Sequence, residues 1–265
     1  MITDDVLALA RELADVADVL TMTAFGRNPE VRRKADGTEV TAVDVAVEVS
    51  LRERITAVFP DHLILGEEDG WGSLESAGSS VSDGTPVWTI DPIDGTTNFI
   101  KGNPIFATLI ACSVDGEDRV GVVSAPALTS RWEGVVGEGA RQDGRPIQVS
   151  DIAALADAEV AVGSFHDIEV RLPGMLAHLS ATTLRQRGYG DFWSYCLLAA
   201  GSTDVVLEAQ LNPWDLAAVR AVVEAAGGRV TDLEGAARST GGSAVATNGL
   251  LHDEVLTMIR QHRRD

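Results

Sequence analysis

A short segment near the middle of the chain has the residue types of a combined metal and phosphate site. Asp91 and Asp94 are separated by two residues, and Gly95 and Thr96 follow them directly. A tight turn would bring both carboxylates to one side, and the small residues after them are typical of a helix start, whose free N–H groups attract anions. Mg²⁺ prefers hard oxygen ligands and often shares them with a substrate phosphate. The segment therefore predicts a divalent cation between carboxylates and a phosphate.

Three further carboxylates occur where a shared site would need them. Glu67 and Glu68 follow an apolar stretch and Gly66, and Asp215 stands at the start of a strongly apolar segment. Each has an ordinary explanation alone, because Asp-Pro-x-Asp-Gly is rich in turn formers, the two glutamates suit an exposed loop, and Asp215 suits a helix start. Together they supply the charge that several cations require, since unpaired carboxylates in one pocket would repel each other.

Short apolar strands should deliver these residues to one edge of a sheet. The run 87–90 predicts a strand that stops at Pro92, because proline cannot donate a backbone hydrogen bond. The run 62–65 predicts a strand ahead of Glu67, and helical spacing of apolar residues predicts helices over 4–25 and 42–58. Further strands are predicted over 105–114, 120–125, 132–136 and 146–149.

The pattern changes after about residue 150, where stretches of strand and helix alternate. We therefore expect helices on a largely antiparallel sheet in residues 1–150, carrying most metal ligands, and a smaller α/β unit in residues 151–265, carrying Asp215 and the substrate-selecting residues. A Gly- and Ser-rich stretch at 69–86 predicts a flexible loop. The alternating stretches are 158–164, 168–180, 183–188, 190–201, 203–208, 214–226, 228–232, 243–247 and 250–261.

The composition argues against several classes of function. The net charge is −19, and nucleic-acid binding is not expected because a phosphate backbone needs a basic face. An acidic surface by itself only aids solubility. No apolar run approaches the roughly 20 residues of a membrane helix, and the acidic N-terminus lacks a secretory pattern, so we expect a cytoplasmic protein without membrane contact. Cys112 and Cys196 suit buried free thiols.

Three segments resemble, in order and spacing, motifs of the inositol monophosphatase family. They are Gly-Glu-Glu at 66–68, Asp-Pro-Ile-Asp-Gly-Thr-Thr-Asn-Phe at 91–99 and Trp-Asp-Leu-Ala-Ala at 214–218. The resemblance spans about residues 34–249 and implies an α/β fold of the layered α/β/α/β/α type shared with fructose-bisphosphatase. It also implies Mg²⁺-dependent hydrolysis of a small phosphate monoester by metal-activated water, two to three Mg²⁺ ions per active site, a homodimer and inhibition by lithium.

The same resemblance assigns metal ligation to five positions. Glu67, Asp91 and the carbonyl of Ile93 would hold a first Mg²⁺. Asp91, Asp94 and Asp215 would hold a second, and Glu67 would help to hold a weaker third. The metals would neutralise the phosphoryl oxygens, lower the pKa of water and stabilise the leaving alkoxide, so that no residue needs to be phosphorylated.

Phosphate binding and proton transfer are also assigned by the resemblance. Gly95, Thr96 and Thr97 would bind phosphate, and Glu67, Thr96 and Asp44 would orient and deprotonate the attacking water.

Lys34, Thr41 and Asp44 resemble a Lys and a Thr-x-x-Asp that family members carry near the metals. Two alternatives stay open, namely that Asp44 caps a helix and that Lys34 is a solvated loop residue.

The second half of the chain should select the substrate. The runs 189–195 and 241–249 resemble histidinol-phosphate phosphatases of this family, notably actinobacterial ones, which act in histidine biosynthesis. Asp191 stands where inositol phosphatases carry small residues, and Glu208 stands where the family has an acid that contacts substrate hydroxyls. The ammonium and imidazole of L-histidinol phosphate would pair with these two acids, with Asp94 and Asp215 also facing the substrate.

Other interpretations remain open from the sequence. Asp191 could instead cap a helix over 191–200. Thr97 is a departure, because Lys is expected there in the closest histidinol-phosphate phosphatases. The alternative substrates are inositol 1-phosphate or another sugar phosphate. A third hypothesis is a non-catalytic protein that senses phosphate or metal on the same fold.

Overall fold

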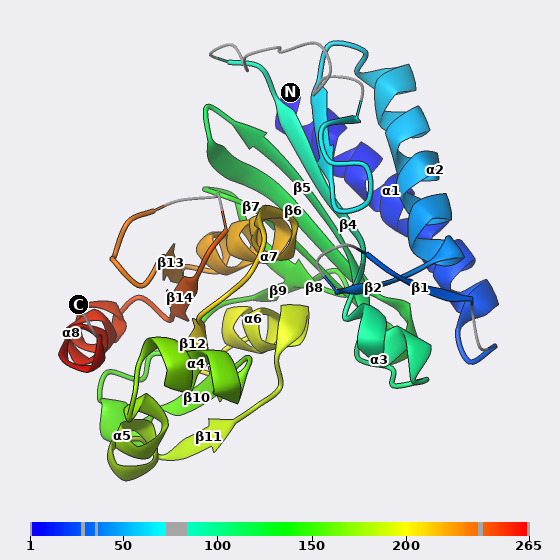
Figure 1. Cartoon of the computed structure of the whole chain (residues 1–265). Coiled ribbons are helices and arrows are strands. Elements are labelled where there is room, and N and C mark those ends of the chain that lie inside the picture. Colours follow the sequence, from blue (N-terminus) through cyan, green and yellow to red (C-terminus); the bar gives the residue numbers. More distant parts are fainter. Residues whose placement is uncertain (1, 28–29, 35–36, 73–83, 238–240, 264–265) are drawn as a thin grey trace.

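A seven-stranded sheet from the first half of the chain carries the central acidic segment (Figure 1). The computed structural model describes residues 2–27, 30–34, 37–72, 84–237 and 241–263. Neighbouring strands are antiparallel except for the first pair, which confirms a largely antiparallel sheet. In order across the sheet the strands are β3 (Leu63–Gly66), β4 (Val87–Asp94), β5 (Ala107–Val114), β6 (Glu117–Ala125), β7 (Ser130–Val135), β8 (Gly139–Gln142) and β9 (Arg145–Ile147).

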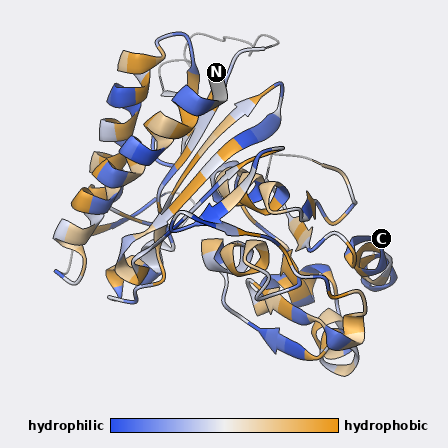
Figure 2. Ribbon diagram, turned by 180° about the vertical axis from the view of Figure 1, so that it is seen from behind, coloured by the Kyte–Doolittle hydropathy of each residue, from blue (hydrophilic) through white to orange (hydrophobic). Residues whose placement is uncertain are grey.

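Two long helices, α1 (Ile2–Ala24) and α2 (Ala42–Val58), cover one face of this sheet. Leu13 and Leu51 are fully buried there against Trp88 and Ile90 of β4. Figure 2 shows hydrophilic and hydrophobic residues alternating along both helices, as expected when one side of a helix packs on a sheet. Burial of the apolar side therefore fixes α2 beside β4, close to the end of the strand where the acidic segment begins.

The opposite face of the sheet packs on α6 (Asp191–Ala199) and α7 (Pro213–Ala225). Helix α7 approaches β6 and β7 closely because both strands present glycine to it. A Cβ on Gly121 would collide with the carbonyl oxygen of Ala218, and one on Gly134 would lie 2.7 Å from the Cα of Val222. This close contact sets the position of the first residues of α7 relative to β4.

A five-stranded sheet lies beyond α6 and α7, and a last helical layer covers its outer face (Figure 1). The five layers confirm the predicted α/β/α/β/α sandwich. The strand order is β11 (Arg185–Arg187), β10 (Glu159–Val162), β12 (Val205–Glu208), β14 (Ala244–Thr247) and β13 (Arg229–Thr231). The outer helices are α4 (Phe165–Arg171), α5 (Met175–Thr182) and α8 (His252–His262).

Several local predictions needed correction. No strand was predicted between the first two helices, where β1 (Val31–Arg33) and β2 (Glu39–Thr41) form an antiparallel hairpin. The strand β8 was missed. The single helix expected over 168–180 divides into α4 and α5 at Pro173 and Gly174, and Gly174 has a φ of +84°. Strand β4 does not stop at Pro92, because a bulge between Asp91 and Asp94 accommodates the missing N–H.

Each sheet is built from residues on one side of position 150, while α6 and α7 pack against both sheets. Whether residues 1–150 and 151–265 behave as separate domains stays a prediction.

Residues 73–83 of the predicted flexible loop lie outside the described residues. Within the part of the chain that the structure describes, no helix combines the length and apolar character that crossing a bilayer demands. Short elements complete the chain: α3 (Thr96–Ile100) and 3-10 turns at Pro126–Leu128 and Leu155–Asp157.

Candidate active site

The end of β4 places two buried carboxylates side by side. Asp91 and Asp94 are 2% and 7% exposed. The bulge between them turns the chain, and the N–H of Ile93 donates to Oδ1 of Asp91 at 3.0 Å. Oδ2 of Asp94 accepts the N–H of Phe192, the second residue of α6, at 2.8 Å. A residue of the second half of the chain thus fixes the orientation of Asp94.

Asp215 reaches the same point from the start of α7. It is the third residue of α7 and closes a capping box, in which its Oδ2 accepts the N–H of Asn212 at 2.7 Å. The predicted helix-start role of Asp215 is therefore real, and it coexists with a place in the site. One oxygen from each of Asp91, Asp94 and Asp215 lies within 4.8 Å of the others.

The electrostatics of this cluster favour a cation. Burial first, and then repulsion by Glu67, Asp94 and Asp215, raises the pKa of Asp91 well above its usual value. Burial and the neighbouring carboxylates likewise raise the pKa of Asp94 strongly and that of Asp215 to about 6. Hard carboxylate oxygens gathered at this spacing suit Mg²⁺. The donor set therefore fits Mg²⁺, and Ile93, whose carbonyl is a predicted ligand, lines the same cavity as these carboxylates.

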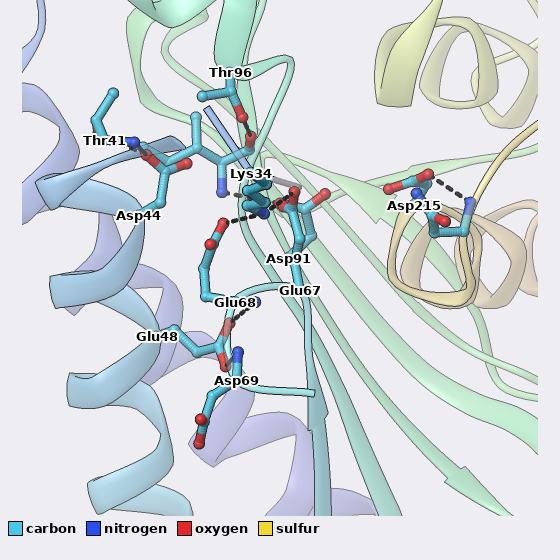
Figure 3. Close-up of polar contacts among 12 residues, drawn as sticks. Lys34, Thr41, Asp44, Glu48, Glu67, Glu68, Asp69, Asp91, Thr96 and Asp215 are labelled. Carbon is cyan, nitrogen blue, oxygen red and sulfur yellow. Dashed lines mark hydrogen bonds and ion pairs between the residues drawn. The ribbon is translucent and has the colours of Figure 1, made fainter. Parts of the chain in front are cut away.

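Glu67 follows β3 and lies against Asp91, as Figure 3 shows. Lys34 contacts this segment from the β1–β2 hairpin, and its Nζ donates to Oε1 of Glu67 at 2.8 Å and to Oε1 of Glu68 at 2.7 Å. Burial disfavours the charged form of Lys34, but these bonds outweigh that cost and raise its pKa. Burial raises the pKa of Glu68 to about 7. Lys34 is therefore an ion-pair partner of the candidate ligand and not a solvated loop residue.

Asp44 is completely buried at the start of α2. Its Oδ2 accepts the N–H of Thr41 at 2.8 Å and the Thr41 hydroxyl at 2.6 Å, which closes a capping box. Its Oδ1 is buried without a hydrogen-bond partner among the described residues. Burial, and less strongly the charge of Glu67, raises the pKa of Asp44. Asp44 thus caps the helix with one oxygen and keeps the other available on the side of Glu67.

The predicted phosphate-binding residues line a cavity of about 580 Å³ beside the cluster. Gly95 has φ +78°, and a Cβ there would lie 2.9 Å from the carbonyl oxygen of Ile105, so only glycine suits this turn. Thr96 and Thr97 begin α3, whose first N–H groups have no acceptor within the helix. The Thr96 hydroxyl donates to the carbonyl of Ile93 at 2.9 Å.

The two predicted substrate acids are placed differently. Asp191 lines the cavity, and its Oδ2 accepts from Nδ2 of Asn98 at 3.3 Å. It makes no helix-capping bond, because Gly190 is the N-cap of α6. Asp191 has φ +48°, an uncommon conformation that often marks functional positions.

Glu208 is not among the residues that line the cavity. Its Oε2 accepts the Tyr195 hydroxyl at 2.6 Å, and burial raises its pKa to about 8. The charge of Asp191 contributes to that shift, and direct contact of Glu208 with a substrate stays a prediction.

Sequence reasoning assigned no role to six cavity residues, among them Gly37 and Thr38 of the β1–β2 hairpin. Arg33, Glu39, Asn98 and Asn212 all line the cavity, and Oε2 of Glu39 accepts the Thr97 hydroxyl at 3.1 Å. Asn98 directly follows Thr97, and Asn212 lies three residues before Asp215. Their closeness in sequence to predicted site residues could have identified both. Arg33 and Glu39 reach the cavity only because the β1–β2 hairpin folds over it, which no local pattern indicated.

Comparison with known proteins agrees with this geometry. The model of the inositol monophosphatase family matches residues 3–264. The chain belongs to this family. The family's shared fold explains why a 32% identical inositol monophosphatase (IMPase) structure from Thermotoga maritima superimposes with a TM-score of 0.85 over 97% of both chains.

Several curated members of the family are named histidinol-phosphatase, two of them from actinobacteria. The protein from Mycobacterium tuberculosis is 47% identical, covering 96% of this chain and 98% of its own length. The protein from Streptomyces coelicolor is 40% identical, covering 97% of both. The predicted resemblance to actinobacterial members is therefore confirmed.

Stabilisation by Mg²⁺ should depend on pH in this family member. A carboxyl group whose pKa is raised by folding binds more protons in the folded state than in the unfolded state. The metal-free protein therefore loses stability as the pH rises from about 4, the unfolded pKa, through the folded pKa values of these groups. For Asp215 the folded pKa is about 6. Bound Mg²⁺ removes this repulsion but competes with protons. We expect the Mg²⁺-induced increase in Tm to grow from about pH 5 to about pH 8. Thermal melts with MgCl₂, and with NaCl at matched ionic strength as a control, would show this, and an increment that falls with pH would contradict it.

Proposed function

We propose that the protein is a Mg²⁺-dependent phosphatase that hydrolyses L-histidinol phosphate to histidinol and phosphate. The observation that carries this proposal is Asp191, which lines the cavity next to Gly95 and Asn98 and near the cluster of Asp91, Asp94 and Asp215. An anionic group there suits a substrate whose leaving group is cationic. The names of the two actinobacterial relatives support the same substrate.

The residues divide the work as follows. Asp91, Asp94 and Asp215, with Glu67 and the carbonyl of Ile93, would hold two to three Mg²⁺ ions. When bound, Mg²⁺ stabilises charge on the phosphoryl oxygens and makes water a stronger nucleophile.

The N–H groups of Gly95, Thr96 and Thr97 bind the phosphate oxygens in the cavity. The Thr96 hydroxyl orients the attacking water, and the carboxylate of Glu67 accepts its proton, with Asp44 behind it.

Discrimination follows from charge. Histidinol phosphate carries an ammonium group and an imidazole, whereas an inositol phosphate carries only hydroxyls beside its phosphate. Asp191 would pair with the cationic group. Glu208, whose Oε2 accepts the Tyr195 hydroxyl, does not line the cavity, and its pairing with the substrate stays a prediction. Asp94 accepts the N–H of Phe192, which follows Asp191 in the chain. This hydrogen bond connects the metal cluster to the segment that carries Asp191.

A substrate panel tests the proposal. With Mg²⁺ present, kcat/KM for histidinol phosphate should exceed that for myo-inositol 1-phosphate by at least about tenfold, the value of one charge-assisted hydrogen bond. Equal values would favour the second candidate, an inositol-phosphate or sugar-phosphate phosphatase, which Thr97 and the Thermotoga IMPase structure support. No hydrolysis of any ester would leave a non-catalytic phosphate- or metal-binding protein. Homodimer formation, a cytoplasmic location and lithium inhibition stay predictions from the resemblance.

A further inference from the structure

A buried ion pair on α2 holds the turn that carries Glu67. Figure 3 shows Glu48 lying under the backbone of this turn. Glu48 is 1% exposed, and both of its oxygens are used. Oε2 accepts the N–H of Glu68 at 2.8 Å, and Oε1 accepts the N–H of Asp69 at 3.1 Å. One carboxylate therefore binds two successive backbone N–H groups immediately after Glu67.

Arg52, one helical turn further along α2, completes the arrangement. Its Nε donates to Oε1 of Glu48 at 2.8 Å. Its two terminal nitrogens donate to the carbonyl of Gly70 at 2.6 Å and to the carbonyl of Ile64 at 3.4 Å. The guanidinium therefore ties the strand before the turn to the residue after it, a reach that its planar group of five donors allows.

The side chains of Glu48 and Arg52 pack directly against Gly66 of this turn. A Cβ on Gly66 would collide with Oε1 of Glu48 and lie 2.7 Å from a terminal nitrogen of Arg52. The backbone of the turn is closed by the N–H of Gly66, which donates to the carbonyl of Gly70 at 2.9 Å. The ion pair in this position therefore leaves room only for glycine at position 66.

Glu67 needs such support because its neighbours repel it. Its carboxylate lies against Asp91, and its charge is felt by Asp215 and Asp44 as well. Without a cation, repulsion favours movement of the turn away from the cluster. A turn tied to a rigid helix keeps the ligand near its binding position and lowers the cost of ordering it when the cation binds.

We infer that Glu48 and Arg52 are positioning residues that preorganise Glu67 for Mg²⁺. This inference rests on the metal role proposed for Glu67. Neither Glu48 nor Arg52 lines the cavity, so both act only through the turn. The pair differs from an ordinary intrahelical ion pair because both side chains also form hydrogen bonds to backbone groups of the turn and of the strand before it.

Replacing Glu48 by Gln tests this inference. An amide has only one acceptor oxygen, so one of the two positions now held by carboxylate oxygens becomes an NH₂ group. Either the N–H of Glu68 loses its acceptor, or the N–H of Asp69 and the Nε of Arg52 lose the oxygen that they share. We expect about tenfold weaker Mg²⁺ binding by calorimetry and faster amide exchange at residues 67–70, because supporting partners of metal ligands are worth tenfold or more. KM for the ester should change much less than the Mg²⁺ affinity.

Two further variants make the result decisive. Arg52→Lys keeps the charge beside Glu48 but cannot reach both carbonyls, so it should fold and give a smaller loss of Mg²⁺ affinity, which decides the matter if Glu48→Gln does not fold. Glu224→Gln is the matched control, since Glu224 forms an i,i+4 ion pair with Arg220 at 3.0 Å on α7. It should leave Mg²⁺ affinity unchanged. Equal Mg²⁺ affinity in wild type, Glu48→Gln and Arg52→Lys would overturn the inference, whereas a wild-type protein without saturable Mg²⁺ binding would overturn the proposed function instead.

Discussion

Replacing Asp94 by Asn is expected to lower kcat for phosphate release by about a thousandfold or more. Asp94 is one of three carboxylates whose oxygens lie within 4.8 Å of one another. Loss of its charge weakens cation binding where the phosphate is neutralised, a contribution of several kcal/mol, and each 1.4 kcal/mol is about a factor of ten in rate. Steady-state phosphate release across a range of Mg²⁺ concentrations measures the effect.

The same substitution should not weaken the metal-free fold. The amide oxygen of Asn can still accept the N–H of Phe192, and repulsion from Asp191 and Asp215 is relieved. The Tm without Mg²⁺ should therefore be equal or higher, while the increase on adding Mg²⁺ should shrink. Asp204→Asn is a matched control, because Asp204 is also buried and accepts a backbone N–H, that of Glu159, at 2.7 Å. It should cost stability and leave kcat near the wild-type value. Full activity in Asp94→Asn would refute the predicted metal site.

Replacing Asp191 by Asn should reduce discrimination between substrates by about tenfold to a hundredfold. A hydrogen bond to a charged group is worth about 1.5–3 kcal/mol, so loss of the carboxylate should raise KM for histidinol phosphate by this factor. KM for myo-inositol 1-phosphate should stay the same or fall. Asn is the suitable replacement because it tolerates the φ of +48° at this position, whereas Ala would add backbone strain.

A second cavity acid serves as the control for this experiment. Glu39→Gln removes one negative charge from the same cavity but on the side of Thr97, to which Glu39 is bonded. It should affect both esters alike. An equal change for the two esters in Asp191→Asn would mean that Asp191 does not pair with the cationic part of the substrate.

The sequence predicted much of the fold because its signals are local. Helical spacing predicted α2 over 42–58, where the structure places Ala42–Val58, and the resemblance implied the layered sandwich. The errors have physical causes. Pro92 did not end β4, since a bulge removes the need for its N–H. The β1–β2 hairpin carries no alternating apolar pattern, because its first strand is fully exposed.

The sequence alone determined which residue types stand at the site. Carboxylates at 67, 91, 94 and 215, and the glycine and threonines after Asp94, occur in motifs short enough to be recognised without a structure. The motifs could not show that the two oxygens of one carboxylate can have different partners. Asp44 and Asp215 each give one oxygen to a capping box, so the alternatives of helix cap and site residue were not exclusive.

Only the tertiary structure decided which residues meet. Asp215 joins Asp91 because glycines in β6 and β7 let α7 approach the sheet, and Asp191, at the first position of α6, lines the same cavity. Glu48 lies under the Glu67 turn only through the packing of α2 on β4. These contacts join residues far apart in the chain, and they depend on complementary volumes and hydrogen bonds between elements, which local sequence patterns do not encode.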